Sequence, residues 1–196
     1  MPISLMPPTA FMTDEQRFLL PGTHNWRQFK VLEALLRAEY AGVRLFYSDG
    51  KIELMTVSQR HELIKSILEA LLVTFFFQHQ INAVPMGNAT MQSEEQGSSA
   101  EPDLSYRSDG QLGLPELAIE IVLSSGEMEK LTRYRSLGIA EVWFWQDDTL
   151  ALYRLEEGEY VRIRSSYLLP TLDIAKLIRC VGLKKLLDAM QAFQAV

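Results

Sequence analysis

Apolar residues recur every three or four positions in two long stretches of the chain. This spacing places them on one face of a helix, so the sequence predicts amphipathic helices over residues 24–40 and 59–79. Thr23 and Ser58 precede these stretches and are predicted to cap them, because hydroxyl side chains accept hydrogen bonds from free N–H groups at helix starts. The apolar positions are Trp26, Phe29, Leu32, Leu35 and Leu36, then Ile64, Ile67, Leu68, Leu71, Leu72 and Phe75.

Between the two helices, residues 43–47 and 51–55 form two apolar-rich runs. Ser48-Asp49-Gly50 separates them, and Asp-Gly between such runs is typical of a tight β-hairpin. After the second helix, we expect short extended segments at 81–86, 89–94 and 101–107, with a polar loop at 95–100. The sequence therefore predicts a β-hairpin before the second helix and short strands after it.

The second half begins with residues 117–123 (LAIEIVL), which are apolar except for Glu120. A run that is apolar on both faces is typical of a central strand. A short helix over 127–137, ended by Gly138, and a second apolar strand at 141–146 follow. Strand, helix and strand in this order predict a βαβ unit with two parallel strands. Ser124-Ser125-Gly126 is expected to end the first strand.

A hairpin turn near 156–159 and helices near 173–194 complete the expected elements. Together they predict an α/β (α+β) fold, with a central mixed β-sheet flanked by helices and preceded by an N-terminal helix and β-hairpin. The proline-rich residues 1–22 are expected to form an arm, and 23–196 a single domain, which suits a chain of 196 residues.

Composition narrows the class of protein. Hydrophobic residues are 47% and charged residues 22%, as in ordinary globular proteins. The single cysteine, Cys180, excludes a disulfide framework and a Cys-rich metal site. A net charge of -6 argues against a protein that coats nucleic acid by charge alone. No signal-peptide or membrane-spanning pattern is visible, so we expect a cytoplasmic protein without a membrane partner.

Glu120 is the chemical anomaly, because burying an unpaired carboxylate in an apolar strand costs several kcal/mol. It is expected to be paired, protonated or bound to a metal. Asp103 begins an earlier extended segment, and Lys130 lies on the helix that follows Glu120. If the two strands are neighbours, both carboxylates converge. Two carboxylates suit a hard divalent cation, and an ammonium group suits developing negative charge on a phosphoryl group.

These residues, in this order, resemble the PD-(D/E)xK nuclease superfamily, whose members have the restriction-endonuclease-like fold. Within it, the chain resembles the bacterial Uma-type branch, formerly a domain of unknown function. The resemblance covers roughly residues 40–175 and rests on several short motifs. They are Asp49 to Met55, Ser58 to Glu62, Glu101-Pro102-Asp103-Leu104, Leu117 to Ser125, Lys130-Leu131 with Tyr134, Gly138 to Trp145, and Ser166 with Leu169-Pro170. The superfamily usually places its lysine two residues after the acid, where this chain has Val122, so Lys130 would replace it.

The resemblance implies a divalent-metal-dependent endonuclease that hydrolyses phosphodiester bonds, with DNA as the favoured nucleic-acid substrate. It implies that Asp103 and Glu120 bind Mg²⁺ or Mn²⁺ and that Lys130 positions the base or stabilises charge. Glu53, His61, Glu62 and Tyr134 form a second tier: further ligands, a proton donor or groups packed near the site. A homodimer is the simplest way for a one-site domain to cut both strands.

Each residue also has a plainer interpretation. Asp103 suits a turn, Glu120 a buried salt bridge to Arg133 or Lys130, and Lys130 or His61 a solvated surface. Glu53 suits an exposed cross-strand pair with Arg44. The alternative function is therefore a nucleic-acid or protein binding module that keeps the nuclease fold without cleavage.

Overall fold

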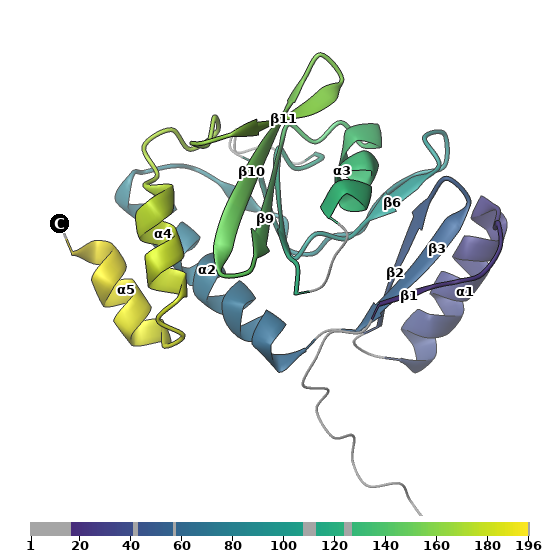
Figure 1. Ribbon diagram of the computed structural model, residues 1–196, viewed down its shortest axis with the longest axis horizontal. Helices are drawn as coiled ribbons and strands as arrows, with labels where there is room; N and C mark the ends of the chain where they lie inside the picture. The colour runs from purple at the N-terminus through teal and green to yellow at the C-terminus, as the bar shows by residue number, and fades with distance from the viewer. Residues whose placement is uncertain (1–16, 41–42, 57, 108–112, 124–126, 196) are drawn as a thin grey trace, which may run out of the picture.

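The computed structural model describes residues 17–40, 43–56, 58–107, 113–123 and 127–195. Their helices and strands form two β-sheets with helices packed around them (Figure 1). The expected mixed α+β fold is therefore confirmed. Most of the predicted N-terminal arm and the Ser124-Ser125-Gly126 strand end lie outside the described residues.

The first sheet is antiparallel, with strand order β1-β3-β2-β6-β5. The strands are β1 (Arg17–Leu19), β2 (Val43–Ser48), β3 (Lys51–Thr56), β5 (Met91–Ser93) and β6 (Ser98–Ala100). Strands β2 and β3 form the predicted hairpin. Asp49 and Gly50 both have positive φ at its turn, which is why Gly follows Asp there. Helix α1 (Trp26–Glu39) packs on this sheet through Phe29.

Three local expectations are corrected here. Helix α1 is capped by Asn25, not Thr23, because Asn25 and Gln28 form a reciprocal capping box. The polar loop expected at 95–100 ends in strand β6, and β1 lies within the range expected to form an arm. Both strands gain main-chain partners from the hairpin region, which local residue preference does not encode.

The second sheet is mixed, with strand order β11-β10-β9-β8-β7-β4. Strands β8 (Leu117–Ile121) and β9 (Glu141–Gln146) are parallel and joined by α3 (Glu127–Ser136), which confirms the predicted βαβ unit. Gly138 ends that connection with a φ of 71°. The remaining strands are antiparallel: β4 (Val84–Pro85), β7 (Leu104–Arg107), β10 (Thr149–Glu156) and β11 (Glu159–Ile163).

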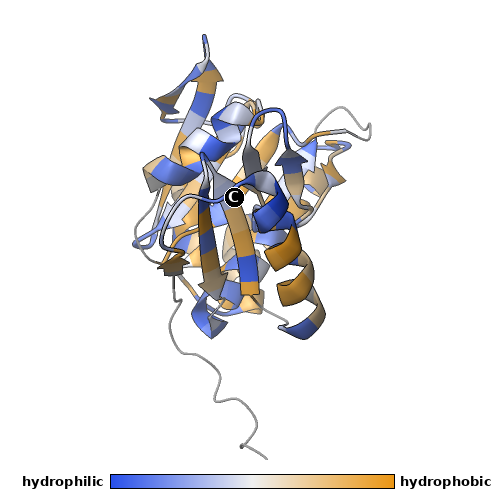
Figure 2. Cartoon of the chain, turned by 90° about the vertical axis from the view of Figure 1, so that its right-hand side faces the viewer, coloured by the Kyte–Doolittle hydropathy of each residue, from blue (hydrophilic) through white to orange (hydrophobic). Residues whose placement is uncertain are grey.

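The two faces of β8 have different neighbours. Ile119 and Ile121 face the largest core, which includes α2 (Gln59–Gln78), α4 (Ile174–Val181) and α5 (Leu186–Gln194). Ala118 and Val122 face α3 and share a smaller core with it. Because side chains alternate along a strand, Glu120 points toward α3 and not into the large core. Figure 2 shows apolar and hydrophilic residues interspersed along the strands and helices.

Helix α2 is capped by Ser58, as predicted. The Ser58 hydroxyl accepts a hydrogen bond from the His61 backbone N–H at 3.2 Å. The cap fixes the first helical turn, which places His61 inside the protein with none of its surface exposed. Phe75 and Phe76 near the other end are buried, whereas Phe77 is 85% exposed. In the described part of the chain, no helix has the length and hydropathy needed to cross a membrane.

Candidate active site

Asp103 and Glu120 approach each other because β7 and β8 are antiparallel neighbours. The Asp103 backbone N–H donates to Ile119 O at 3.0 Å, and the Ile121 N–H donates to Asp103 Oδ2 at 2.7 Å. The Asp103 carboxylate is therefore tied to the peptide that follows Glu120. Both residues are almost fully buried, at 0% and 1% exposed. The charges of both carboxylates act on the same neighbours, Arg44 and Tyr134, as expected for groups that share one site.

Glu120 is held by two side chains of α3. Lys130 Nζ donates to Glu120 Oε2 at 2.6 Å, and the Tyr134 hydroxyl donates to Glu120 Oε1 at 2.5 Å. Lys130 and Tyr134 are four residues apart, so they lie on the same face of the helix. Lys130 is 3% exposed and Tyr134 is 1% exposed. The expectation that Lys130 is a solvated helix residue is wrong, because this ion pair draws it inside.

Asp103 is held by residues from two other elements. Arg44 of β2 forms an ion pair with Oδ1, and His61 of α2 places Nε2 3.0 Å from Oδ2. Burial alone would raise the pKa of the Asp103 carboxyl, but the contact with His61 and the charge of Arg44 outweigh it. The pKa of Asp103 therefore lies well below its usual range, and the group is a carboxylate at neutral pH.

The two buried carboxylates also shift the pKa values of Arg44 and Tyr134. Burial alone would lower the pKa of Arg44, but the charge of Asp103 outweighs burial and raises it. Burial and the charge of Glu120 raise the pKa of Tyr134 well above 10. At neutral pH the phenol therefore keeps its proton and acts as a hydrogen-bond donor to Glu120. The four charged groups of this centre, Asp103, Glu120, Arg44 and Lys130, sum to zero.

The second-tier residues divide into three cases. His61 and Tyr134 contact the carboxylates directly. Glu53 is buried and pairs with Arg133 of α3, so the expectation of an exposed pair with Arg44 is wrong. Register explains the error: Glu53 faces Phe46 across the hairpin. The Glu62 side chain is half exposed and contacts His61 Nδ1 at 3.2 Å, and no contact with either carboxylate is recorded for it.

Arg44 is the site residue that sequence reasoning missed. The sequence pattern suits one half of an exposed cross-strand pair, yet Arg44 is 8% exposed and bound to Asp103. A signal was present, because Arg44 precedes Leu45, Phe46 and Tyr47 in an otherwise apolar run. A charged residue in such a run raises the same question as Glu120 and predicts a buried partner.

A divalent cation fits the donor chemistry of this centre. Asp103 and Glu120 offer hard, anionic oxygens, which Mg²⁺ and Mn²⁺ prefer. Among the described residues, Asp103 Oδ1 and both Glu120 oxygens each accept one recorded hydrogen bond, which leaves each a second lone pair. No group of three or more His, Cys, Asp or Glu side chains within the described ranges has the arrangement of a metal site. Two carboxylates therefore suit a cation that keeps several water ligands.

Comparison with known families agrees with the restriction-endonuclease-like fold. The model of the Uma2 family, described as "Putative restriction endonuclease", matches residues 26–181. The match spans α1 to the end of α4 and includes Arg44, His61, Lys130 and Tyr134, the side chains that hold Asp103 and Glu120 in the described part of the chain. A search of curated proteins finds no match.

Proposed function

The chain belongs to the Uma2 family of restriction-endonuclease-like proteins, and from this premise we propose that it is a divalent-metal-dependent endonuclease acting on DNA. One observation carries the proposal: two adjacent buried carboxylates, Asp103 and Glu120, each paired with a buried cation. Buried charges are costly to maintain, and groups with a shifted pKa, such as Asp103, cluster at functional sites.

In this proposal Asp103 and Glu120 hold the cation, with water completing its coordination. The cation would polarise a phosphoryl oxygen and lower the pKa of a bound water. Arg44 and His61 keep Asp103 ionised and oriented through the contacts described above. Tyr134 fixes the Glu120 carboxylate through its hydroxyl. These contacts hold both carboxylates in place before substrate arrives, which favours catalysis by avoiding reorganisation.

Lys130 has the catalytic role in this proposal. Its ammonium group lies at Glu120 and is close enough to Asp103 for its charge to lower that residue's pKa. There it would orient the attacking water or stabilise negative charge that develops on the phosphate. The centre is neutral without a cation, so a bound divalent ion gives it an excess of two positive charges. A phosphodiester and the attacking hydroxide supply the opposite charge.

The direct test is cleavage of supercoiled plasmid DNA with Mg²⁺ or Mn²⁺, compared between the wild-type protein and Asp103→Asn. We expect metal-dependent nicking by the wild type and none by the variant, with circular dichroism showing that both are folded. A single-stranded RNA of the same sequence tests the choice of DNA. Equal nicking by both proteins would contradict the proposal.

A non-catalytic binding module is the second candidate. Its support is that Arg44 and Lys130 already neutralise the two carboxylates, as purely structural ion pairs do. Calorimetric titration with Mn²⁺ separates the two functions. A nuclease shows metal binding that is lost in Asp103→Asn, whereas a binding module has no need of carboxylate-dependent metal affinity.

We also propose that the protein is a homodimer, because a pair of single-site domains is the simplest way to cut both DNA strands. The exposed Phe77 and its neighbour Val73, 51% exposed on the same helix, support an apolar contact surface. Light scattering of the wild type and Phe77→Ser tests this. A dimeric wild type and a monomeric variant are expected, and a monomeric wild type at micromolar concentration would refute the proposal.

A further inference from the structure

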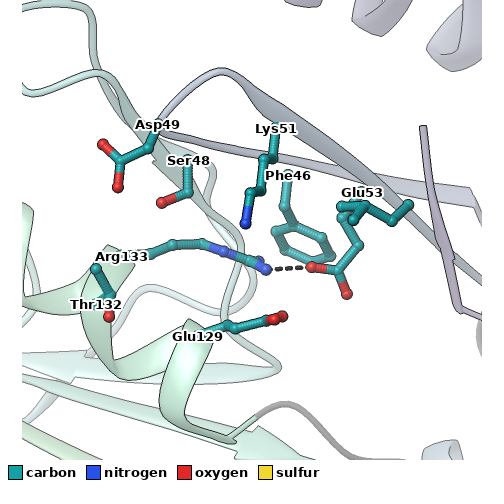
Figure 3. Close-up of a pocket in the computed structure, with 9 residues that line it drawn as sticks. Phe46, Ser48, Asp49, Lys51, Glu53, Glu129, Thr132 and Arg133 are labelled. Atoms are coloured by element: carbon teal, nitrogen blue, oxygen red, sulfur yellow. Dashed lines mark hydrogen bonds and ion pairs between the residues drawn. The ribbon is translucent and has the colours of Figure 1, made fainter. Parts of the chain in front are cut away.

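A pocket of about 210 Å³ lies beside the candidate active site, between the β2–β3 hairpin and α3 (Figure 3). Two elements contribute to both places. Strand β2 gives Arg44 to the active site and Phe46 to the pocket, and helix α3 gives Lys130 to the site and Arg133 to the pocket. Residues two apart on a strand are separated by about 7 Å. The pocket is therefore adjacent to the candidate active site along both β2 and α3.

An unsatisfied donor in this pocket points to a ligand. Arg133 is 4% exposed, and one of its terminal nitrogens is paired with Glu53, but its buried Nε–H has no hydrogen-bond partner. Leaving a buried donor unpaired costs roughly 1–3 kcal/mol, so native proteins seldom do so without a functional reason. In Figure 3 the Arg133 side chain crosses the pocket, with Lys51 on one side and Glu129 on the other. An acceptor atom in the pocket would satisfy this donor.

The pocket offers acceptors as well as donors. Lys51 and Arg133 are donors, and the acidic residues Asp49 and Glu129 also line the pocket. A phosphate group carries only acceptors and negative charge, so these carboxylates would repel it. A nucleobase carries both donors and acceptors. The volume is below the roughly 300–1,000 Å³ of pockets for drug-sized ligands, which suits a single base.

Guanine matches this arrangement best among the bases. Its O6 and N7 are adjacent acceptors and form the commonest specific contacts with Arg and Lys. Its N1–H and N2–H₂ are adjacent donors, which one carboxylate can accept together. We propose that this pocket binds a guanine base of the substrate strand, with Lys51 and Arg133 at O6 and N7 and Glu129 at N1 and N2. The proposal rests on the proposed nuclease function and adds a base preference to it.

Nucleotide binding without metal tests the pocket separately from cleavage. The probes are dGMP, dAMP, dCMP, dTMP and inorganic phosphate, titrated into ¹⁵N-labelled protein while the Arg Nε–H resonances are recorded. Arg133→Lys identifies the Arg133 signal by its loss. We expect dGMP to shift that signal and to bind at least about tenfold more tightly than the other nucleotides. Equal shifts from all four nucleotides, or competition by phosphate alone, would overturn the proposal.

Variants of exposed residues locate the binding without disturbing the core. Glu129 and Lys51 are both exposed, so Glu129→Gln and Lys51→Met are expected to fold. Each should weaken dGMP binding by about tenfold or more, because one good base contact contributes that much discrimination. Glu95→Gln, an exposed carboxylate on the β5–β6 turn, is the matched control and should bind dGMP as the wild type does. Unchanged binding in Glu129→Gln would refute the assignment.

A further variant separates failure of this inference from failure of the proposed function. Glu120→Gln changes the candidate active site and leaves every pocket residue intact, so it should bind dGMP normally while failing to cut DNA. Selective dGMP binding by a wild-type protein that cuts no DNA would leave the pocket assignment standing and remove the nuclease. Cleavage without base selectivity would leave the nuclease and remove the pocket assignment.

Discussion

Strands β8 and β9 are parallel neighbours, and each buries one glutamate that is 1% exposed. Glu141 of β9 accepts hydrogen bonds from the Trp143 indole N–H at 2.6 Å and from the backbone N–H groups of Tyr167 and Leu168 at 2.9 and 3.2 Å. Glu120 of β8 is held instead by an ammonium and a phenol, both from α3. The same residue type in the same sheet is thus stabilised in two different ways.

The difference separates a structural carboxylate from a candidate catalytic one. Neutral N–H donors satisfy Glu141 and anchor the chain after β11 to the sheet, which is a common use of a buried acceptor. Glu120 is paired with a cation and lies beside Asp103, a second carboxylate. That arrangement is costly for stability alone, since apolar residues of similar size often stabilise a core equally well. The burial of Glu120 therefore supports the chemical role proposed for it, whereas its three hydrogen bonds explain the burial of Glu141.

The largest expected effect is on cleavage by glutamine variants of these two residues. Glu120→Gln should lower metal-dependent plasmid nicking by at least about 100-fold, because it removes an anionic metal ligand. Glu141→Gln should change nicking less than about threefold at a temperature where both variants are folded. Initial nicking rates, with folding checked by circular dichroism, provide the measurement. Equal losses in the two variants would mean that Glu120 is structural too.

Replacing Lys130 tests the role of Glu120 further, because it separates metal binding from the cleavage step. Lys130→Met should lower cleavage by about 10- to 100-fold, as expected for loss of a charge-stabilising group. Metal affinity should be retained or increased, because the ammonium group no longer competes for Glu120 Oε2. Mn²⁺ should also raise the melting temperature of this variant more than that of the wild type, by neutralising the carboxylate left unpaired. Parallel loss of metal affinity and cleavage would contradict this division of roles.

The contribution of the Glu141 hydrogen bonds to stability can be measured with one variant. Glu141→Gln turns its NH2 group either toward the Trp143 indole N–H or toward the backbone N–H groups of Tyr167 and Leu168, so at least one donor loses its acceptor, at a cost of about 2 kcal/mol. For a chain of this length the melting temperature should fall by roughly 4–8 °C. Differential scanning calorimetry measures the shift, and Glu157→Gln in the exposed β10–β11 turn is the control. An unchanged melting temperature would show that the three hydrogen bonds contribute nothing net.

Acid should weaken the candidate active site through Asp103. The pKa of Asp103 is lower in the folded protein than its unfolded value of about 3.9. A depressed pKa contributes stability that is present above the unfolded value and lost as the pH falls below about 4. Urea unfolding at pH 7, 4 and 3 should therefore show a fall below pH 4 that is smaller in Asp103→Asn. The same fall in both proteins would assign the acid sensitivity to other carboxylates.

The contrast between Glu120 and Glu141 also shows what the sequence can predict. Glu120 interrupts an apolar run, so its burial and its need for a partner were predictable, and so was the βαβ unit that brings Lys130 back to it. Glu141 begins its strand, where a carboxylate is unremarkable, and its donors Tyr167 and Leu168 follow in a distant segment. Such long-range partners leave no local pattern.

Long-range contacts also explain why the partners of Arg44 and Glu53 were not predicted. The two-residue turn at Asp49-Gly50 sets a register in which Met55 lies opposite Arg44 and Phe46 lies opposite Glu53, so the expected direct cross-strand pair of Arg44 and Glu53 is wrong within the hairpin itself. Their true partners, Asp103 and Arg133, come from the other sheet and from α3. A hairpin sequence specifies its own turn and register, whereas the contacts made by its inner face depend on the second sheet. The candidate acids were therefore predictable, and the cations that hold them were predictable only in part.

The smallest expected effect concerns the phenol that holds Glu120 in place. Tyr134→Phe keeps the buried ring and removes one hydrogen bond to Glu120 Oε1, so the free energy of unfolding should fall by about 1 kcal/mol. Cleavage should fall less than about tenfold, because Lys130 still orients the carboxylate. The pKa of Tyr134 is raised above 10, so its hydroxyl donates a hydrogen bond without acting as a base, and the variant should keep the wild-type pH dependence of cleavage between pH 6 and 9. A changed pH profile in that range would show that Tyr134 transfers a proton.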